Sequence, residues 1–193
     1  MLMNRKEITS LLTNTLINTR LSDRKYYAKE VTLDYGTTHP KRVDVMEFKP
    51  GGVIYASDIE KGTFACYEIK SCKEDVYSGH GLRFYGEENY IVTTMACYKD
   101  LQGDIREGRL RKYIEDNYPE SSLYYGVMVL VPEHVDVKSS DEVFKEYENP
   151  TPLNSPCSWK LYKILPCRPG SRARSITELL FCMLRAKHSY TNN

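Results

Sequence analysis

The sequence lacks the patterns that mark a zinc-binding, disulfide-rich or membrane protein. Its six cysteines stand far apart, with no C-x-x-C pair and no neighbouring histidine, which excludes the usual zinc-site spacings. We expect reduced cysteines in the core, with a disulfide as the alternative. The longest apolar run, Tyr124–Pro132, is too short to span a bilayer, and Met1–Glu7 is too polar for the core of a signal peptide. We therefore expect a cytoplasmic protein without a membrane partner.

An excess of charge of one sign is also missing. The chain carries 27 Lys and Arg against 26 Asp and Glu, a net charge of +1, which argues against indiscriminate coating of nucleic acid. The segment 159–193 is nevertheless basic, since Glu178 is its one acid. Its basic residues are Lys160, Lys163, Arg168, Arg172, Arg174, Arg185 and Lys187. We expect Arg172 and Arg174 to bind nucleic-acid phosphates, whereas Arg185 and Lys187 equally suit a helix end that complements its own dipole.

The composition that remains is typical of one globular domain over residues 1–193. The chain is 41% hydrophobic and 27% charged, and it contains no repeat or low-complexity tract. Hydrophobic periodicity predicts an α/β fold with a mixed β-sheet flanked by helices. The expected helices are Asn4–Leu21, a helical insertion at 96–122 and a basic C-terminal helix at 171–188. The expected strands are Tyr27–Leu33, Arg42–Phe48, Thr63–Ile69, Asn89–Thr94, Gly126–Pro132 and Trp159–Leu165.

Short-range signals refine the connections between these elements. Val53–Ala56 can begin a strand that returns after the turn at residues 49–52. Ser71, with Glu74 three residues later, resembles the capped start of a helix. Ser171 or Ser175 can cap the C-terminal helix.

Three side chains on two of the expected strands are the main clue to function. Glu68 and Lys70 lie two residues apart and therefore point to one face of the sheet, and an antiparallel neighbour would bring Asp44 alongside Glu68. Two carboxylates in contact repel each other unless a cation lies between them, and Mg²⁺ binds through one or two carboxylates while it retains water. We therefore expect Asp44 and Glu68 to bind a metal ion. Such a metal site suits the hydrolysis of a phosphodiester bond, in which the metal ion activates a water molecule. Lys70 would then hold this attacking water or contact the scissile phosphate.

At these residues the chain resembles the PD-(D/E)XK nuclease superfamily, whose core motif is an Asp, then Glu or Asp, one apolar residue and Lys. Asp44, Glu68 and Lys70 match this motif. The segments 30–33, 42–45 and 68–75 look like the MmcB-like DNA-repair branch, so that residues 24–100 carry most of the resemblance. Val43 stands where the name-giving Pro would be, and the 24-residue step from Asp44 to Glu68 is longer than in compact members.

The resemblance implies a restriction-endonuclease-like core and a nuclease that hydrolyses DNA with Mg²⁺ or Mn²⁺, in DNA repair or in phage or mobile-element biology. It also implies Glu30 as an auxiliary catalytic residue. Lys73 and Arg83 are further candidates for contact with single-stranded, flapped or duplex DNA, and a homodimer is compatible with the pattern. One alternative is a catalytically silent nuclease fold that binds DNA or a protein partner. Another is a solvated ion pair on a strand, which also produces an E-x-K pattern.

Overall fold

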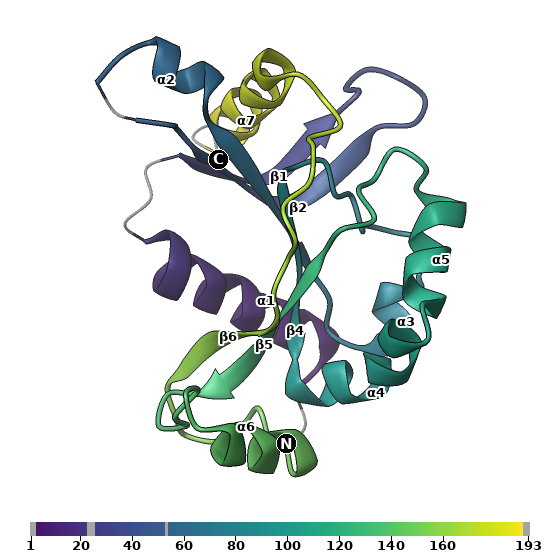
Figure 1. Cartoon of the computed structure of the whole chain (residues 1–193), viewed down its shortest axis with the longest axis vertical. Helices are drawn as coiled ribbons and strands as arrows, with labels where there is room; N and C mark the ends of the chain where they lie inside the picture. The colour runs from purple at the N-terminus through teal and green to yellow at the C-terminus, as the bar shows by residue number, and fades with distance from the viewer. Residues whose placement is uncertain (1–2, 23–25, 53, 191–193) are drawn as a thin grey trace.

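The computed structural model describes residues 3–22, 26–52 and 54–190 and shows a mixed α/β arrangement (Figure 1). The strands are β1 (Tyr27–Leu33), β2 (Lys41–Lys49), β3 (Thr63–Ile69), β4 (Glu88–Thr94), β5 (Gly126–Pro132) and β6 (Trp159–Leu165). The helices are α1 (Arg5–Leu16) with a π-helical extension η1 (Ile17–Leu21), α2 (Ser57–Glu60), α3 (Lys73–Val76), α4 (Met95–Arg106), α5 (Arg109–Asn117), α6 (Ser140–Glu148) and α7 (Ile176–Tyr190). The predicted α/β class is confirmed.

The strands form one sheet in the order β1-β2-β3-β4-β5-β6. Neighbours are antiparallel from β1 to β3, parallel from β3 to β5, and antiparallel again between β5 and β6. Parallel neighbours need a crossover connection. The segment with α3 provides it between β3 and β4, and α4 with α5 provides it between β4 and β5. The predicted strands are present, and β6 lies at the sheet edge as expected.

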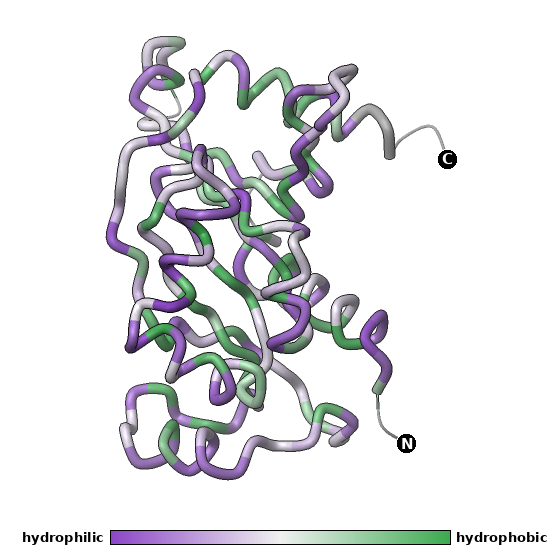
Figure 2. The backbone as a smooth tube through the Cα atoms, turned by 90° about the vertical axis from the view of Figure 1, so that its right-hand side faces the viewer, coloured by the Kyte–Doolittle hydropathy of each residue, from purple (hydrophilic) through white to green (hydrophobic). Residues whose placement is uncertain are grey.

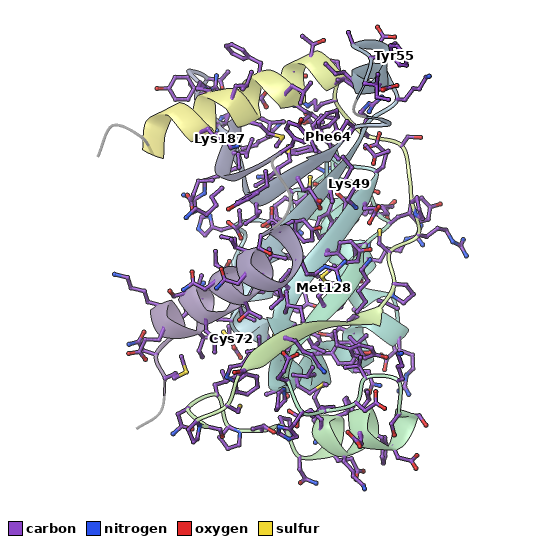
Figure 3. The ribbon with its side chains drawn as sticks, turned by 90° about the vertical axis from the view of Figure 1, so that its left-hand side faces the viewer. Lys49, Tyr55, Phe64, Cys72, Met128 and Lys187 are labelled. Atoms are coloured by element: carbon purple, nitrogen blue, oxygen red, sulfur yellow. The ribbon has the colours of Figure 1, made fainter. Side chains whose placement is uncertain are left out.

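Side-chain alternation along the strands gives the sheet two apolar faces. Tyr67 of β3 belongs to the face covered by α1, where Leu12 is fully buried. Phe64 of β3 belongs to the opposite face, where Leu179 of α7 packs against it, and α4 and α5 cover the rest of that face around Leu101. Hydrophobic residues recur through the central strands and are interspersed with hydrophilic ones along the helices (Figure 2). Figure 3 shows α1 crossing the sheet near Met128 and α7 lying near Phe64.

The helix ends follow from local hydrogen bonding. The Asn4 side chain accepts the Glu7 N–H at 3.0 Å, and the Glu7 carboxylate accepts the Asn4 N–H at 2.7 Å, which forms a capping box at the start of α1. Ser175 caps α7, because its Oγ accepts the Glu178 N–H at 3.2 Å. Gly108 separates α4 from α5 with φ +75°, a conformation that favours glycine. The expected helices at both termini and in 96–122 are therefore present.

The connection from β2 to β3 differs from the expected one. Val53 lies outside the described residues, and Ile54 to Ala56 form no strand. The Ile54 and Tyr55 N–H groups donate to Asp58 Oδ2, at 3.4 and 3.1 Å, and the chain then enters α2. A side chain therefore takes the donors that a returning strand would have paired, which a local apolar pattern does not reveal.

The start of α3 also differs. Ser71 is not its cap: the helix begins at Lys73 after Cys72, which makes no side-chain cap. The Ser71 N–H instead donates to Asp75 Oδ2 at 3.0 Å. The capping-box pattern was misleading because Asp75, one position after the expected Glu74, accepts the hydrogen bond from the Ser71 N–H.

Candidate active site

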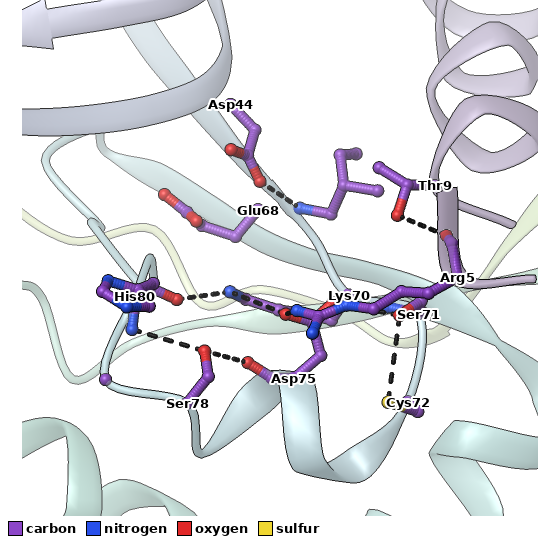
Figure 4. Close-up of polar contacts among 12 residues, drawn as sticks. Arg5, Thr9, Asp44, Glu68, Lys70, Ser71, Cys72, Asp75, Ser78 and His80 are labelled. Carbon is purple, nitrogen blue, oxygen red and sulfur yellow. Dashed lines mark hydrogen bonds and ion pairs between the residues drawn. The ribbon is translucent and has the colours of Figure 1, made fainter. Parts of the chain in front are cut away.

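Two paired strands separate at the residues that the sequence singled out. Strands β2 and β3 are in register from Lys49 opposite Thr63 to Val45 opposite Tyr67. The next residue on β2, Asp44, accepts the Ile69 N–H through Oδ2 at 2.8 Å, so a side chain replaces a bond of the strand ladder. The structure thus brings Asp44 next to Glu68, at the point where the sheet opens (Figure 4).

Glu68 is fully buried and only partly satisfied. Its Oε1 accepts the Arg83 N–H at 3.1 Å. Its Oε2 is buried and has no hydrogen-bond partner in the described part of the chain. Burial, followed by repulsion from Asp44, raises the pKa of Glu68 to about 8, against the opposing effect of Lys70.

Asp44 has the same electrostatic character. Burial raises the pKa of Asp44, whereas the Ile69 N–H and the charge of Lys70 act to lower it. Two adjacent carboxyl groups that both resist ionisation form a site where either a proton or a cation is strongly favoured.

Lys70 projects from the end of β3 into the same space, and its side chain is 4% exposed. Its Nζ donates to the carbonyl oxygen of His80 at 2.6 Å and lies 4.0 Å from Asp75 Oδ1. Gly81 closes over this amine: its φ is +91°, and a Cβ built there would lie 2.5 Å from both Lys70 Nζ and Glu68 Oε2. A side chain at this position would therefore occupy the space between the two groups.

Asp75 is a member of the site that the sequence pattern did not identify. It is 7% exposed, and Oδ2 accepts both the N–H and the Oγ hydrogen of Ser71, at 3.0 and 3.1 Å. Its Oδ1 pairs with Arg5 from α1 and faces Lys70. The only available signal was an acid five residues after Lys70, because Arg5 is 70 residues away in the chain.

A cavity of about 690 Å³ is lined by Asp44, Lys70 and Asp75, whereas the fully buried Glu68 is not among its described lining residues. Three parts of the chain form its walls, namely α1, the β1–β2 hairpin, and the loop from Gly79 to Arg83. Its charged and hydroxyl-bearing lining residues are Arg5, Thr9, Thr13, Lys29, Glu30, Thr32, Arg42, Asp44, Lys70, Asp75 and Arg83, and His80 also lines it. Arg83 also stacks its guanidinium over Tyr118, 4.6 Å from the ring centroid.

Glu30 lies on the cavity wall but does not join the two carboxylates. Its side chain is 44% exposed and pairs with Arg42 at 2.5 Å. Its φ of +55° is unusual for a residue within a strand, and the β1–β2 register pairs its neighbours Lys29 with Val45 and Val31 with Val43. The pair with Arg42 engages the Glu30 carboxylate, and its role as an auxiliary catalytic residue stays a prediction.

The other predicted nucleic-acid contacts lie elsewhere. Lys73 pairs with Asp104 at 2.8 Å on the side of α4. Arg172 pairs with Glu87 at 2.8 Å. Arg174 pairs with three carboxylates, those of Asp34, Glu120 and Glu178. None of the three basic residues is among those that line the cavity, whereas Arg83 is. Their contact with DNA stays a prediction.

The residues present fit a divalent ion bound by few protein ligands. Within residues 3–22, 26–52 and 54–190 no group of three or more His, Cys, Asp or Glu side chains is arranged to hold a metal. Asp44 and Glu68 offer two carboxylates, and one oxygen of Glu68 is buried without a hydrogen-bond partner in the described chain. Mg²⁺ and similar ions accept such sites, because water and a substrate phosphate complete their coordination.

Comparison of the chain with protein-family models, curated proteins and solved structures finds no match. The resemblance to PD-(D/E)XK nucleases therefore stays a prediction carried by the residues quoted above. Among the described helices, none has the length and apolarity to cross a membrane.

Proposed function

We propose that this chain is a metal-dependent nuclease that hydrolyses phosphodiester bonds in DNA, with Asp44 and Glu68 as its metal ligands. The observation that carries the proposal is Glu68 Oε2, a buried oxygen without a hydrogen-bond partner in the described chain, beside a second carboxyl group of raised pKa. Buried polar atoms are normally satisfied, and an exception calls for a specific explanation, of which a bound ion is one. A divalent cation would relieve both the repulsion and the missing contact.

The remaining tasks fall to the side chains around this pair. A bound Mg²⁺ would act as a Lewis acid on a phosphate oxygen and lower the pKa of a nearby water. Lys70 presents an ammonium close to Glu68, where it can hydrogen-bond a water or a phosphate oxygen and offset charge that develops on the phosphate. The burial of Lys70 strengthens this effect, because screening by water is weak there.

The cavity lining supports a nucleic-acid backbone as the substrate. Besides Lys70, four Lys or Arg side chains and three threonines line the cavity. These groups suit phosphate and sugar oxygens. No Phe, Tyr or Trp is among the described lining residues, so base stacking on large aromatic rings contributes little inside the cavity. We infer that the site reads the backbone and is indifferent to base identity.

The test is cleavage of labelled single-stranded, flapped and duplex DNA with Mg²⁺, Mn²⁺ or EDTA. The variants are Asp44→Asn, Glu68→Gln and Lys70→Met, which keep side-chain size. We expect metal-dependent cutting that falls about 10³-fold or more in each, since several kcal/mol of transition-state stabilisation are removed. The matched controls are Asp116→Asn and Lys112→Met, an exposed ion pair on α5, and both should cut normally.

Calorimetric titration with Mn²⁺ separates the proposal from its alternative. The natural chain should bind Mn²⁺, and Glu68→Gln should not. A chain that binds DNA but neither cuts it nor binds Mn²⁺ would be the silent nuclease fold. Cutting that survives Glu68→Gln would disprove the assignment of the site.

A further inference from the structure

The surroundings of Lys70 raise a question about charge. Its ammonium and Glu68 Oε2 both lie against Gly81, yet the structure shows no hydrogen bond between them. A buried ammonium beside a buried carboxyl oxygen would ordinarily donate a hydrogen bond to it, whether that group is ionised or neutral, because no water can take its place. Something must therefore hold the amine away from this oxygen.

The geometry points to Asp75 as a positioning residue: we propose that it draws the Lys70 ammonium away from Glu68 and so leaves Glu68 Oε2 free for the metal ion. This inference rests on the proposed function, in which Glu68 is a metal ligand. Asp75 itself touches neither the metal nor the substrate in this scheme. It acts through Lys70.

The contacts of Asp75 hold its carboxylate where it can attract the Lys70 ammonium. Ser71 fixes the carboxylate, since its N–H and its Oγ hydrogen both go to Oδ2. That arrangement leaves Oδ1 pointing at Lys70, 4.0 Å from Nζ, and at Arg5. Both side chains are largely buried, at 10% exposure for Asp75 and 4% for Lys70. Two hydrogen bonds hold the Asp75 carboxylate in this buried place, so water screens its attraction for the Lys70 ammonium only weakly.

The His80 carbonyl completes the arrangement. It accepts from Lys70 Nζ at 2.6 Å and lies on the loop that contains Gly81. Figure 4 shows Lys70 between the Asp44–Glu68 pair and the Asp75 side chain, with His80 beside it. The ammonium is thus placed between carboxylates on two sides, and the balance between them fixes its position. If the charge of Asp75 is removed, the remaining attraction is toward Glu68.

The test compares Mn²⁺ affinity in four proteins: the natural chain, Asp75→Asn, Lys70→Met and the double variant. Asn at position 75 keeps the size and an oxygen for Ser71 but loses the charge. We expect Asp75→Asn to weaken Mn²⁺ binding about 10- to 100-fold, the usual effect of a residue that orients a ligand. Removing Lys70 as well should restore affinity to that of Lys70→Met alone, because no amine is left to occupy Oε2.

Rescue by the second change separates positioning from a merely structural role. If Asp75 only supported the fold, the double variant would bind Mn²⁺ as weakly as Asp75→Asn, and that result would overturn the inference. Equal affinity in Asp75→Asn and the natural chain would also overturn it. Glu74→Gln, at the exposed neighbouring position, is the matched control and should leave affinity unchanged. Thermal unfolding of each variant verifies that it is folded.

A second readout holds even if the natural chain binds no Mn²⁺, an outcome that rejects the proposed function. Crystal structures of the metal-free natural chain and of Asp75→Asn would locate Lys70 Nζ directly. We expect Nζ to remain on the His80 carbonyl in the natural chain and to move within hydrogen-bond distance of Glu68 Oε2 in the variant. An unmoved amine in Asp75→Asn would overturn the role of Asp75.

Discussion

Two buried carboxylates in this molecule have opposite surroundings. Asp104 of α4 accepts from Lys73 at 2.8 Å, from Arg109 at 2.7 Å and from the Tyr77 hydroxyl at 3.0 Å. The hydrogen bond from Lys73, with those from Arg109 and Tyr77, lowers the pKa of Asp104 to about 2 despite burial. Its ionised form is fully matched, so Asp104 joins α3, α4 and α5 as a structural ion pair.

Glu68 lies in the opposite condition. It has one N–H donor and one unpartnered oxygen, and burial with the neighbouring Asp44 raises its pKa to about 8. The folded chain satisfies Asp104 from its own donors and leaves Glu68 incomplete. The comparison separates a carboxylate whose partners the fold supplies from one that the fold leaves without them, and the second kind suits the ligand role proposed for Glu68.

The largest expected effect on this contrast is in the free energy of unfolding, which should depend on pH when EDTA keeps the chain free of metal ions. Because the folded pKa of Glu68 is raised above about 4.5, the folded state retains a proton that the unfolded chain releases. The stability that this retained proton gives the folded state is therefore complete below pH 4.5 and is lost as pH rises to about 8. We expect a loss of several kcal/mol across this window, and Glu68→Gln should lack most of it because an amide does not ionise.

Urea unfolding from pH 4 to pH 9 measures this difference in slope. Glu115→Gln, at an exposed position on α5, is the control and should follow the natural curve. Parallel curves for Glu68→Gln and the natural chain would show that Glu68 ionises in the folded state as freely as in the unfolded one.

Part of this site could be predicted from sequence because strands have a period of two. Alternation alone places Glu68 and Lys70 on one face and Tyr67 on the other, and the apolar runs marked all six strands within a few residues. Short strands with turn residues between them also made an antiparallel neighbour for β3 a sound expectation. Local rules therefore reached Asp44, Glu68 and Lys70.

The rest of the site depends on contacts that no local rule reports. Asp75 pairs with Arg5 from the far end of the chain, and the opening between β2 and β3 depends on Asp44 taking the Ile69 N–H. The basic segment shows the same limit, because Arg172 and Arg174 pair with acids from distant elements and do not line the cavity, while their contact with phosphates stays a prediction. Charge counted along a sequence cannot show which charges are already neutralised in space.

The next largest effect concerns Asp104, the carboxylate whose partners the fold supplies. Asp104→Asn should destabilise the fold by about 1 to 2 kcal/mol at pH 7, less than the pKa shift alone implies, because water screens the half-exposed Lys73 and Arg109. Since the folded pKa of Asp104 is lowered, its contribution is present above pH 4 and is lost as pH falls toward 2. Urea unfolding at pH 7 and pH 2.5 measures it, and the deficit of the variant should be clearly smaller at the lower pH. Mn²⁺ affinity should be unchanged, and a large loss of it would break the distinction between the two regions.

The smallest effect concerns the link between these regions. Tyr77 donates to Asp104, and its ring packs edge-on against Tyr113, with centroids 4.8 Å apart. The Tyr113 hydroxyl accepts the Gly79 N–H at 3.1 Å, at the start of the loop whose later N–H group reaches Glu68. Tyr113→Phe removes this hydrogen bond to a surface loop and should cost about 0.5 to 1 kcal/mol of stability.

If the loop holds Glu68 and Lys70 in place, the same change should slow cleavage about threefold, which corresponds to less than 1 kcal/mol in the barrier. Tyr162→Phe in β6, far along the sheet, is the control for loss of a hydroxyl. An unchanged rate with reduced stability would mean that the Asp104 cluster supports only α3 to α5. A reduced rate would mean that the Asp104 cluster also holds the Gly79–Arg83 loop against Glu68, so that this structural ion pair contributes to the geometry of the proposed metal site.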